Sequence, residues 1–457
     1  MRDIIIQVIY YAAAILFVLG LKRMSSPKTA TSGVQWAGVG MLLAIAVTFL
    51  FPNLHNFALI LLAIAIGTII AWVAAKKVAM TAMPEMIAMY NGMGGGAAAA
   101  IAAIELFKLS SSTTTILPLT TFILAVVGGL IGAVSFSGSI LAFFKLRDWL
   151  KNIYFPMQQI INLSVLASAI LFGLTFFFWH SPIVFVLFFI ASLIYGILMT
   201  MSIGGADMPV VIALYNAFTG LAVACEGFVM NNVAMIIAGT IVGSSGTLLT
   251  LLMAKAMNRS IVNVLFAKFG GGGSGAAVEG TSKSMEVDDA AVMLNFVSKV
   301  IFIPGYGMAV AQAQQKVWEL ASLLIDKGVD VKFAIHPVAG RMPGHMNVLL
   351  AEAGVPYDYI ADMDEINNDF ASTDIVIVLG ANDVVNPAAR TDKTSPIYGM
   401  PILNADQAKQ IFVIKRGKGK GYAGIENLLF FNDKCRMVYG DAKQVMAKMI
   451  QTLKEQE

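Results

Sequence analysis

Val-Ser-Lys-Val-Ile-Phe-Ile-Pro-Gly-Tyr-Gly-Met-Ala-Val-Ala-Gln-Ala-Gln-Gln, residues 297–315, decides the fold of the second part of this chain. The apolar run 300–303 ends at Pro304-Gly305-Tyr306-Gly307, and small helix-forming residues follow from Met308, which predicts a strand, a tight turn and a helix. In a dinucleotide-binding turn, two glycines let the backbone approach a pyrophosphate at the helix N-terminus. A plain strand–helix turn fits the same residues, because Val310 occupies the third glycine position.

The residue after the second predicted strand indicates which nucleotide this turn suits. Dinucleotide folds that bind NAD place an acidic residue there, where it binds the ribose hydroxyl. After the strand 331–335 this chain has His336-Pro337. The missing acid argues against an ordinary NAD contact and leaves room for a 2′-phosphate.

Composition places the first part of the chain in a membrane. Of the 457 residues, 58% are hydrophobic and 13% are charged, and the mean hydropathy is +0.76. Residues 1–275 hold 13 Lys+Arg and 6 Asp+Glu, a net charge of +7, whereas 276–457 hold 18 and 22, a net charge of −4. These sum to the overall +3, so the basic excess belongs to the apolar part and indicates no nucleic-acid partner. An ordinary soluble enzyme is excluded.

The cysteines and histidines predict no disulfide framework and no metal site. Cys225 lies in an apolar stretch and Cys435 in the polar half, far apart in sequence. The four histidines have no metal-ligand spacing; they are His55, His180, His336 and His345.

About nine apolar runs before residue 260 are long enough to span a bilayer. The expected spans are 3–22, 34–51, 56–75, 83–106, 116–144, 160–179, 182–201, 207–230 and 233–257. Basic residues follow the first, third, fifth and ninth spans, which places those ends in the cytoplasm and the N-terminus outside. The odd number of spans puts the C-terminal part in the cytoplasm. The first run has no convincing cleavage site, so we expect a membrane helix and not a removed signal.

A glycine-rich segment beginning at Gly270 predicts a flexible tether between the two parts. Short apolar strands then alternate with helical patterns. The expected strands are 299–303, 331–335, 374–379, 411–414 and 436–439, and the expected helices are 308–326, 345–353, 404–409 and 441–454. This alternation predicts a doubly wound parallel sheet. The fold class is therefore a multi-pass α-helical membrane domain of about nine helices followed by an α/β Rossmann-like domain.

The apolar part contains an internal repeat. Residues 83–91 match 208–216 in the same direction, which indicates a parallel duplication. The paired Asn91 and Asn216 each lie seven residues past a proline, about 10 Å from a helix end at 1.5 Å per residue. Polar groups at that depth either bond across helices or line a water-filled path. The matched positions favour the path.

Acidic residues in the apolar part are further candidates. Asp207, which precedes Met208-Pro209, fits a simple helix N-cap or a titratable group at the cytoplasmic mouth of the helix that carries Asn216. Glu226 is expected to be buried, and Glu85 is expected at the membrane interface.

Three glycine-rich turns follow predicted strands, at the edge where open α/β sheets bind ligands. The turn 336–345 supplies a cation and a flexible backbone, and 380–384 follows the next strand. The third turn, 415–422, interleaves four cations with glycines, which is typical of a phosphate clamp, although a solvated charged surface has the same composition. With the missing acid, these turns favour NADP over NAD.

Together these motifs resemble the proton-translocating NAD(P) transhydrogenase family. Residues 305–314, 336–347, 380–387 and 421–424 resemble its NADP(H)-binding domain, and the apolar part, with 205–209, resembles the membrane part of its β subunit. The resemblance covers essentially the whole chain. It implies hydride transfer from NADH to NADP⁺ coupled to proton translocation. NADH is then bound by a separate α subunit, because this chain has no second dinucleotide turn.

The resemblance also implies roles for individual residues. Beside it, we expect the redox state of NADP to be sensed near Asp207 and to gate proton access along the helices that carry Asn91 and Asn216. The resemblance assigns NADP(H) binding to Gly305, Tyr306, Gly307, Met308, Ala309, Val338, Ala339, Gly340, Arg341, Met342, Pro343, Gly344, Gly380, Ala381, Asn382, Asp383, Val384, Lys415, Arg416, Gly417, Gly421, Tyr422, Asp441 and Ala442. Lys415-Arg416 matches the 2′-phosphate contact, and Asn382-Asp383 matches the nicotinamide region.

The resemblance implies a transmembrane proton-channel domain over 1–262, a linker over 263–289 and an NADP(H)-binding domain over 290–457. It implies a bacterial inner-membrane protein with its C-terminal domain in the cytoplasm, working as a dimer of α–β protomers. The chain departs from many members at Gly417, where they have serine. It also has Asn91 where some have histidine, so the titrating group is expected from the α subunit.

Two other function classes fit part of the sequence. A channel or secondary transporter regulated by a nucleotide-sensing domain explains the spans, the repeat and the tether, but not a clamp suited to a 2′-phosphate. A membrane-anchored binding module without turnover is the simpler alternative.

Overall fold

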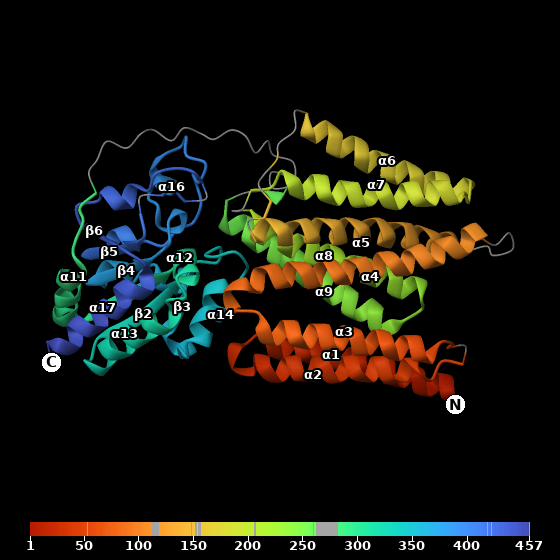
Figure 1. Ribbon diagram of the computed structural model, residues 1–457, viewed down its shortest axis with the longest axis horizontal. Coiled ribbons are helices and arrows are strands. Elements are labelled where there is room, and N and C mark those ends of the chain that lie inside the picture. The colour runs from red at the N-terminus through yellow and green to blue at the C-terminus, as the bar shows by residue number, and fades with distance from the viewer. Residues whose placement is uncertain are drawn as a thin grey trace. The chain divides into compact units, whose positions relative to one another are not determined.

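The computed structural model describes residues 1–457 except 53, 112–117, 148, 151–152, 154–156, 205–206, 259, 262–281, 418, 422 and 457. They form two compact units. The helical unit comprises Met1–Ser202 and Val211–Thr250, and the C-terminal unit comprises Ile203–Val210 and Leu251–Glu457. The predicted fold class, a nine-helix membrane domain followed by a Rossmann-like α/β domain, is confirmed (Figure 1).

Within the described ranges, nine helices are long and apolar enough to cross a membrane, which makes the chain a multi-pass membrane protein. They are α1 (Arg2–Met24), α2 (Pro27–Thr48), α3 (Phe57–Lys77), α4 (Met83–Ser111), α5 (Leu119–Leu146), α6 (Gln158–Phe178), α7 (Pro182–Met201), α8 (Met208–Val229) and α9 (Val233–Ala256). Most boundaries lie near the expected ones. Helix α2 begins earlier than residue 34, because a proline is well accommodated in the first turn of a helix.

Burial differs sharply among these helices. In α8, 72% of the apolar stretch is buried, whereas α3 has no buried residue. Polar side chains on α8 are therefore enclosed by other helices, while α3 exposes apolar surface all round, as a helix facing lipid or a partner does.

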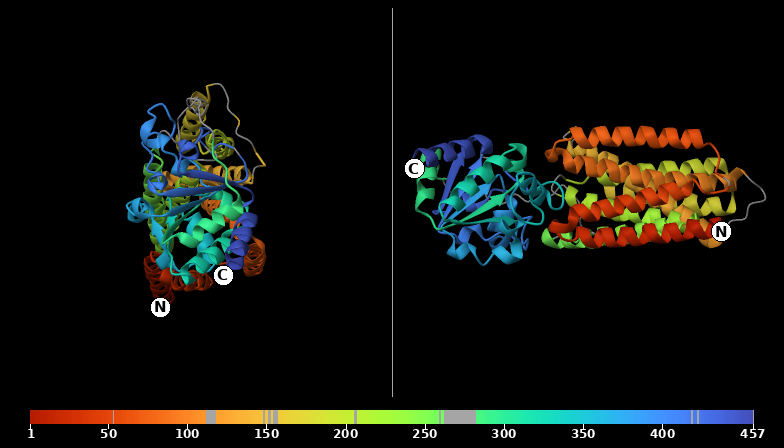
Figure 2. Two further views of the ribbon diagram at one scale, coloured as in Figure 1. Left: turned by 90° about the vertical axis from the view of Figure 1, so that its left-hand side faces the viewer. Right: turned by 90° about the horizontal axis from the view of Figure 1, so that it is seen from below.

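The C-terminal unit contains a six-stranded, all-parallel sheet in the order β3-β2-β1-β4-β5-β6 (Figure 2). The strands are β1 (Lys299–Pro304), β2 (Asp330–Ile335), β3 (Ile360–Asp362), β4 (Ile375–Leu379), β5 (Gln410–Lys415) and β6 (Cys435–Tyr439). The five expected strands are all present. Strand β3 was missed, because its three residues, two partly buried and one exposed, form no apolar run. The order reverses between β1 and β4, which creates a switch point at their carboxyl ends.

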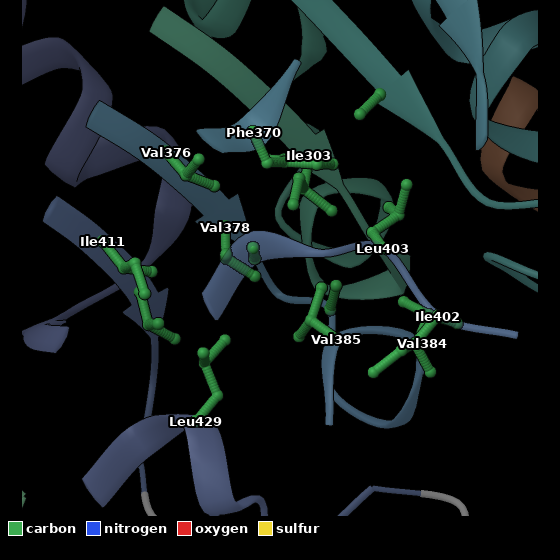
Figure 3. Close-up of a cluster of buried hydrophobic side chains, with 14 of the residues drawn as sticks. Ile303, Phe370, Val376, Val378, Val384, Val385, Ile402, Leu403, Ile411 and Leu429 are labelled. Carbon is green, nitrogen blue, oxygen red and sulfur yellow. The ribbon is translucent and has the colours of Figure 1, made fainter. Parts of the chain in front are cut away.

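Strand side chains alternate between the two sheet faces. On one face, Ile303, Val376, Val378 and Ile411 pack against apolar residues of 3₁₀ turns and connecting segments, Phe370, Val384, Val385, Ile402, Leu403 and Leu429 (Figure 3). The alternate side chains include Phe302 and Phe333, whose rings stack with centroids 5.3 Å apart. Apolar cores on both faces explain why the strands read as continuous apolar runs.

The helices of this unit are α11 (Val287–Met293), α12 (Tyr306–Val310), α13 (Gln314–Asp326), α14 (His345–Glu352), α15 (Met363–Ile366), α16 (Ala388–Thr391) and α17 (Ala442–Glu455). The single helix expected over 308–326 is wrong: α12 and α13 are separated at Gln312, which has a positive φ of 48°. The helix expected over 404–409 is a 3₁₀ turn, Ala405–Gln407. Part of the expected tether is ordered structure, since α11 begins at Val287; its residues 263–281 lie outside the described ones.

Truncating Phe370 tests the packing of the face shown in Figure 3. Phe370 is fully buried, so Phe370→Ala is expected to destabilise the C-terminal unit by about 3–5 kcal/mol, from lost burial and the cavity left behind. Phe296 is 84% exposed, and Phe296→Ala is the matched control, with an expected change under about 0.5 kcal/mol. Pulse proteolysis of the full chain in denaturant measures both. Equal stability of the two variants would contradict the packing.

Candidate functional site

The turn after β1 is locked to the turn after β4 by backbone contacts. Gly305 N donates to Leu379 O at 2.9 Å, and Gly307 N donates to Gly380 O at 3.1 Å. A Cβ at Gly305 would overlap the backbone nitrogen of Ala381, and one at Gly307 would lie 2.7 Å from Gly380 Cα. These glycines let another backbone come close, and in this structure that backbone is the turn after β4. Gly380 has a φ of +64°, which also requires glycine.

The loop after β2 lies beside the same turn. The guanidinium carbon of Arg341 lies 4.4 Å from the centre of the Tyr306 ring, a cation–π geometry. The ring centroids of Tyr306 and His345 are 6.5 Å apart. Residues from two predicted motifs, 305–309 and 338–344, therefore meet at the switch point.

Two buried histidines shape this loop. His336 Nδ1 accepts from Val338 N at 3.2 Å, so its Nε2 carries the proton and donates to Pro401 O at 2.9 Å. His345 Nδ1 accepts from Arg341 N at 3.1 Å. Burial lowers the pKa of each histidine to about 4, helped at His345 by the nearby Arg341 charge. The cation of this loop at neutral pH is therefore Arg341 and not a histidine.

Asp383 holds the cationic turn after β5 close to the turn after β4. Ala423 N donates to Asp383 Oδ2 at 2.9 Å, and a Cβ at Gly421 would overlap the same carboxylate. Lys415 Nζ donates to Gly419 O and lies 4.8 Å from the centre of the Phe430 ring. Burial lowers the pKa of Lys415, and the Asp383 charge opposes this. Of this turn, Lys418 and the predicted site residue Tyr422 lie outside the described residues.

Two buried asparagines that sequence reasoning missed tie these turns together. Asn427 Nδ2 donates to Asn382 O at 2.9 Å. Asn386 Nδ2 donates to Glu426 O at 3.0 Å, while its Oδ1 accepts from Leu428 N at 3.1 Å. Both side chains are almost fully buried, so each bond satisfies a group that would otherwise be costly. Each asparagine stands beside an apolar run in the sequence, but that position alone does not predict a buried hydrogen-bonding role.

The end of β6 lies next to the end of β5. Gly440 N donates to Lys415 O at 3.1 Å, and Asp441 caps α17 by accepting from Lys443 N at 3.1 Å. The predicted residues Asp441 and Ala442 thus border the cationic turn. All the predicted binding segments that the structure describes converge at the carboxyl edge of the sheet.

Several predicted binding residues have buried side chains and can offer a ligand only their backbone. They are Met308, Ala309, Ala339, Met342, Ala381, Val384 and Ala442. Arg416, by contrast, is exposed and forms no ion pair with another described residue. Among the described residues, four cations lie at this edge, Arg341, Lys415, Arg416 and Lys420, which suits an anionic ligand.

In the helical unit, α4 and α8 meet at Asn91. Asn91 Nδ2 donates to Ser139 Oγ on α5 at 3.0 Å, and Thr219 Oγ1 on α8 donates to Asn91 O at 3.3 Å. Ser135 Oγ and Thr219 Oγ1 are 2.7 Å apart. These four side chains form a polar row that joins α4, α5 and α8. Asn91 was predicted, whereas Ser135 and Thr219 were missed because hydroxyls are common in membrane helices.

The repeat does not make Asn216 equivalent to Asn91. Asn216 is half-buried, one turn before Thr219 on α8, and makes no side-chain hydrogen bond within the described ranges. Its neighbour Tyr215 is fully buried, and its hydroxyl lies 2.5 Å from Thr200 Oγ1 on α7. Gly138 makes room for that ring, because a Cβ there would overlap it.

Asp207 is buried immediately before α8, in which Pro209 is the second residue. Gly205 and Ala206 lie outside the described residues.

The sequence model of the family described as "NAD(P) transhydrogenase beta subunit" matches residues 6–452. The chain belongs to this family. Two curated proteins of Rhodospirillum rubrum, one from strain ATCC 11170, are named "NAD(P) transhydrogenase subunit beta". Each is 44% identical to this chain over 454 residues, which cover 97% of this chain and 98% of the relative. Membership in the NAD(P) transhydrogenase beta subunit family supports an oxidoreductase role, against a regulated channel or a binding module without turnover.

Replacing Gly305 tests the contact between the two turns. Gly305→Ala is expected to displace the turn after β4 and to lower stability by about 2 kcal/mol or more, because the new Cβ meets backbone that has no rotamer to change. Gly419→Ala is the control, since its Cβ would meet nothing within 4 Å. Thermal unfolding of the two variants measures the effect. Unchanged behaviour of Gly305→Ala would contradict the contact.

Acidification tests the two neutral histidines. The folded pKa of His336 is about 4 and the ordinary value is 6.5, so the unfolded chain binds the proton first. The stability that depends on neutral His336 is complete above pH 6.5 and is lost as the pH falls toward 4, by about 2 kcal/mol at pH 5. Unfolding of the full chain at pH 7.5 and pH 5 measures this. His336→Gln is expected to reduce the pH dependence, whereas His55→Gln, at an exposed site, is expected to leave it unchanged.

Proposed function

We propose that this chain binds NADP(H) at the carboxyl edge of its sheet and accepts hydride from NADH held by a partner subunit, with coupled proton translocation across the membrane. The observation that carries the proposal is the convergence of the motifs 305–309, 338–344, 380–384 and 415–421 at one edge, with cations around it. Open α/β sheets bind their ligands at this edge.

The donor set suits NADP(H) better than NAD(H). Lys415 is half-buried, so its charge carries a desolvation cost that a bound phosphate would offset. Arg416 is exposed beside it, and a guanidinium binds phosphate in bidentate geometry. We propose these two residues for the 2′-phosphate. Gly417 contributes backbone only, so the clamp lacks the hydroxyl that a serine would add.

The remaining binding residues position the other parts of the nucleotide. We propose that Asn382 and Asp383 border the nicotinamide and that Tyr306, Arg341, Gly340 and Gly344 border the rest. Bound NADP⁺ supplies the hydride-accepting ring. The protein's part is proximity and orientation, because direct transfer between two nicotinamides needs little acid or base from side chains.

We propose that the proton path runs along α4 and α8, past Asn91, Asn216 and Asp207. The polar row of Asn91, Ser139, Ser135 and Thr219 supports this, because it joins α4, α5 and α8 through amide and hydroxyl groups, which can also hydrogen-bond water. Residues 1–262 then form the translocating domain, 263–289 link it to the NADP(H) domain, and 290–457 form that domain.

The partner is an α subunit that binds NAD(H), in a dimer of α–β protomers in a bacterial inner membrane with the C-terminal domain in the cytoplasm. A partner is required by chemistry, because hydride transfer needs a second nicotinamide and the described C-terminal unit has one sheet with one switch point.

Replacing the clamp tests this function. In vesicles that hold the chain with an NAD(H)-binding partner, NADPH is expected to reduce an NAD analogue and move protons. Lys415→Ala with Arg416→Ala is expected to weaken NADP⁺ binding about a hundredfold and to leave NAD⁺ binding unchanged, because charge-assisted bonds to the 2′-phosphate are lost. Nucleotide titration and analogue absorbance measure these effects.

Lys434→Ala serves as the matched control. Lys434 is an exposed cation just before β6, at the opposite edge of the sheet, and its loss is expected to change neither nucleotide. Equal binding of NADP⁺ and NAD⁺ by the unmodified chain, or no analogue reduction with the partner present, would favour the regulated transporter.

A further inference from the structure

Glu226 is a buried carboxyl inside the helical unit. It lies on α8 with no exposed surface, and neither of its carboxyl oxygens has a hydrogen-bond partner in the part of the chain that the structure describes. An unpaired carboxylate in a membrane interior costs several kcal/mol, so such a group needs an explanation.

The neighbouring helix leaves a space for this carboxyl. Gly128 on α5 lies against it, and a Cβ at Gly128 would overlap Glu226 Oε1 and lie 3.1 Å from Cys225 Cβ. Any side chain at position 128 would displace the carboxyl. Helix α5 therefore provides a pocket shaped for Glu226, where an apolar residue on α8 would have packed at lower cost.

This pocket continues the polar row. Glu226 lies seven residues after Thr219 on α8, and Gly128 lies seven residues before Ser135 on α5. Seven residues make two helical turns, so both pairs lie on the same faces of these helices, about 10 Å apart along the contact. The hydrogen-bonded pair Ser135 and Thr219 and the pair Gly128 and Glu226 are successive steps along one interface.

An apolar cluster follows on the other side of Glu226. Ala125 lies one turn beyond Gly128, and Val229 lies one turn beyond Glu226. Ala125 belongs to a buried cluster with Leu106, Phe122, Phe176 and Phe188, and Val229 packs against it. Glu226 therefore stands at the boundary between the polar row and an apolar closure.

The titratable groups around Glu226 are few. On α4 the acid is Glu105, which is paired with Lys108 at 2.6 Å. On α8 the neighbour is the Cys225 thiol, and α5 presents Gly128. The cluster residues of α6 and α7 are apolar. No cation within the described helices pairs with Glu226, and a buried carboxyl without a partner is less costly as the neutral acid than as the carboxylate.

We propose that Glu226 is a proton-binding site of the translocation path, resting on the function proposed above. In the conformation seen here it holds a proton as a neutral acid. When the α5–α8 interface admits water, its O–H bond breaks, the proton passes to water or to the hydroxyl row, and the carboxylate is left to accept the next proton. No electron moves. The row itself offers only amide and hydroxyl groups, none of which titrates near neutral pH, so Glu226 supplies from this chain the group that Asn91 does not.

Infrared difference spectroscopy and proton transport of the complete complex in vesicles test this. The unmodified complex is expected to show a protonated-carboxyl carbonyl band at neutral pH that shifts in D₂O and is absent in Glu226→Gln. Glu226→Gln is expected to reduce NADPH-driven proton movement about a hundredfold, because the amide keeps the shape but holds no transferable proton. Glu226→Asp is expected to recover part of it.

Matched variants separate this role from folding. Cys225→Ala is expected to keep both the band and the proton movement, and Glu105→Gln is expected to keep the band. NADP⁺ binding is expected to be unchanged in all four variants, which serves as the control for assembly of the complex. If Glu226→Gln does not assemble, Glu226→Asp provides the test, because its protonated-carboxyl band is expected at a shifted frequency.

The outcomes distinguish the two proposals. If the unmodified complex moves protons and Glu226→Gln moves them equally, or keeps the band, the assignment of Glu226 is overturned and the proposed function stands. If the unmodified complex moves no protons with NADPH, the proposed function fails first.

Discussion

The contact between the turns after β1 and β4 is the constraint on which the candidate site depends. Gly305 and Gly307 bring one backbone against Gly380 and Ala381 of the other, so neither turn is set by its own sequence alone. Once they are locked, the segment after Gly380 is directed toward the cationic turn, where Asp383 accepts from Ala423 N. The geometry at the carboxyl edge of the sheet therefore depends on Gly305 and Gly307, where no side chain fits.

Buried polar groups then fix the loops that the glycines leave free. The histidines after β2 are neutral because burial lowers the pKa of each, and in that state their Nδ1 atoms accept backbone N–H groups. Between the turns after β4 and β5, Asn427 Nδ2 donates to Asn382 O and Asn386 Oδ1 accepts from Leu428 N. Each bond satisfies a group whose burial would otherwise be unfavourable. The exposed Arg416 and Lys420 take no part in these bonds.

Much of this was readable from the sequence, and the exceptions have physical causes. The nine spans and five strands follow from apolar runs, which depend on local composition alone. The break at Gln312 was not readable, because a positive φ in a non-glycine residue is imposed by packing of the chain around it. The binding motifs were found by their glycines. Asn386, Asn427, Ser135 and Thr219 were not, because a hydrogen-bond partner 40 to 128 residues away leaves no mark on local sequence.

In the repeat of the apolar part, matching sequence positions have different contacts in the structure. Its two halves place Asn91 and Asn216 at matching positions. Among the described residues Asn91 bonds across helices, to Ser139 and Thr219, and the Asn216 side chain does not. A larger share of α8 than of α4 is buried, and Glu226 on α8 has no exposed surface and lies against Gly128 of α5. The two ends of the α5–α8 interface therefore differ: the polar row lies on one side of Glu226, and apolar side chains close the interface on the other side.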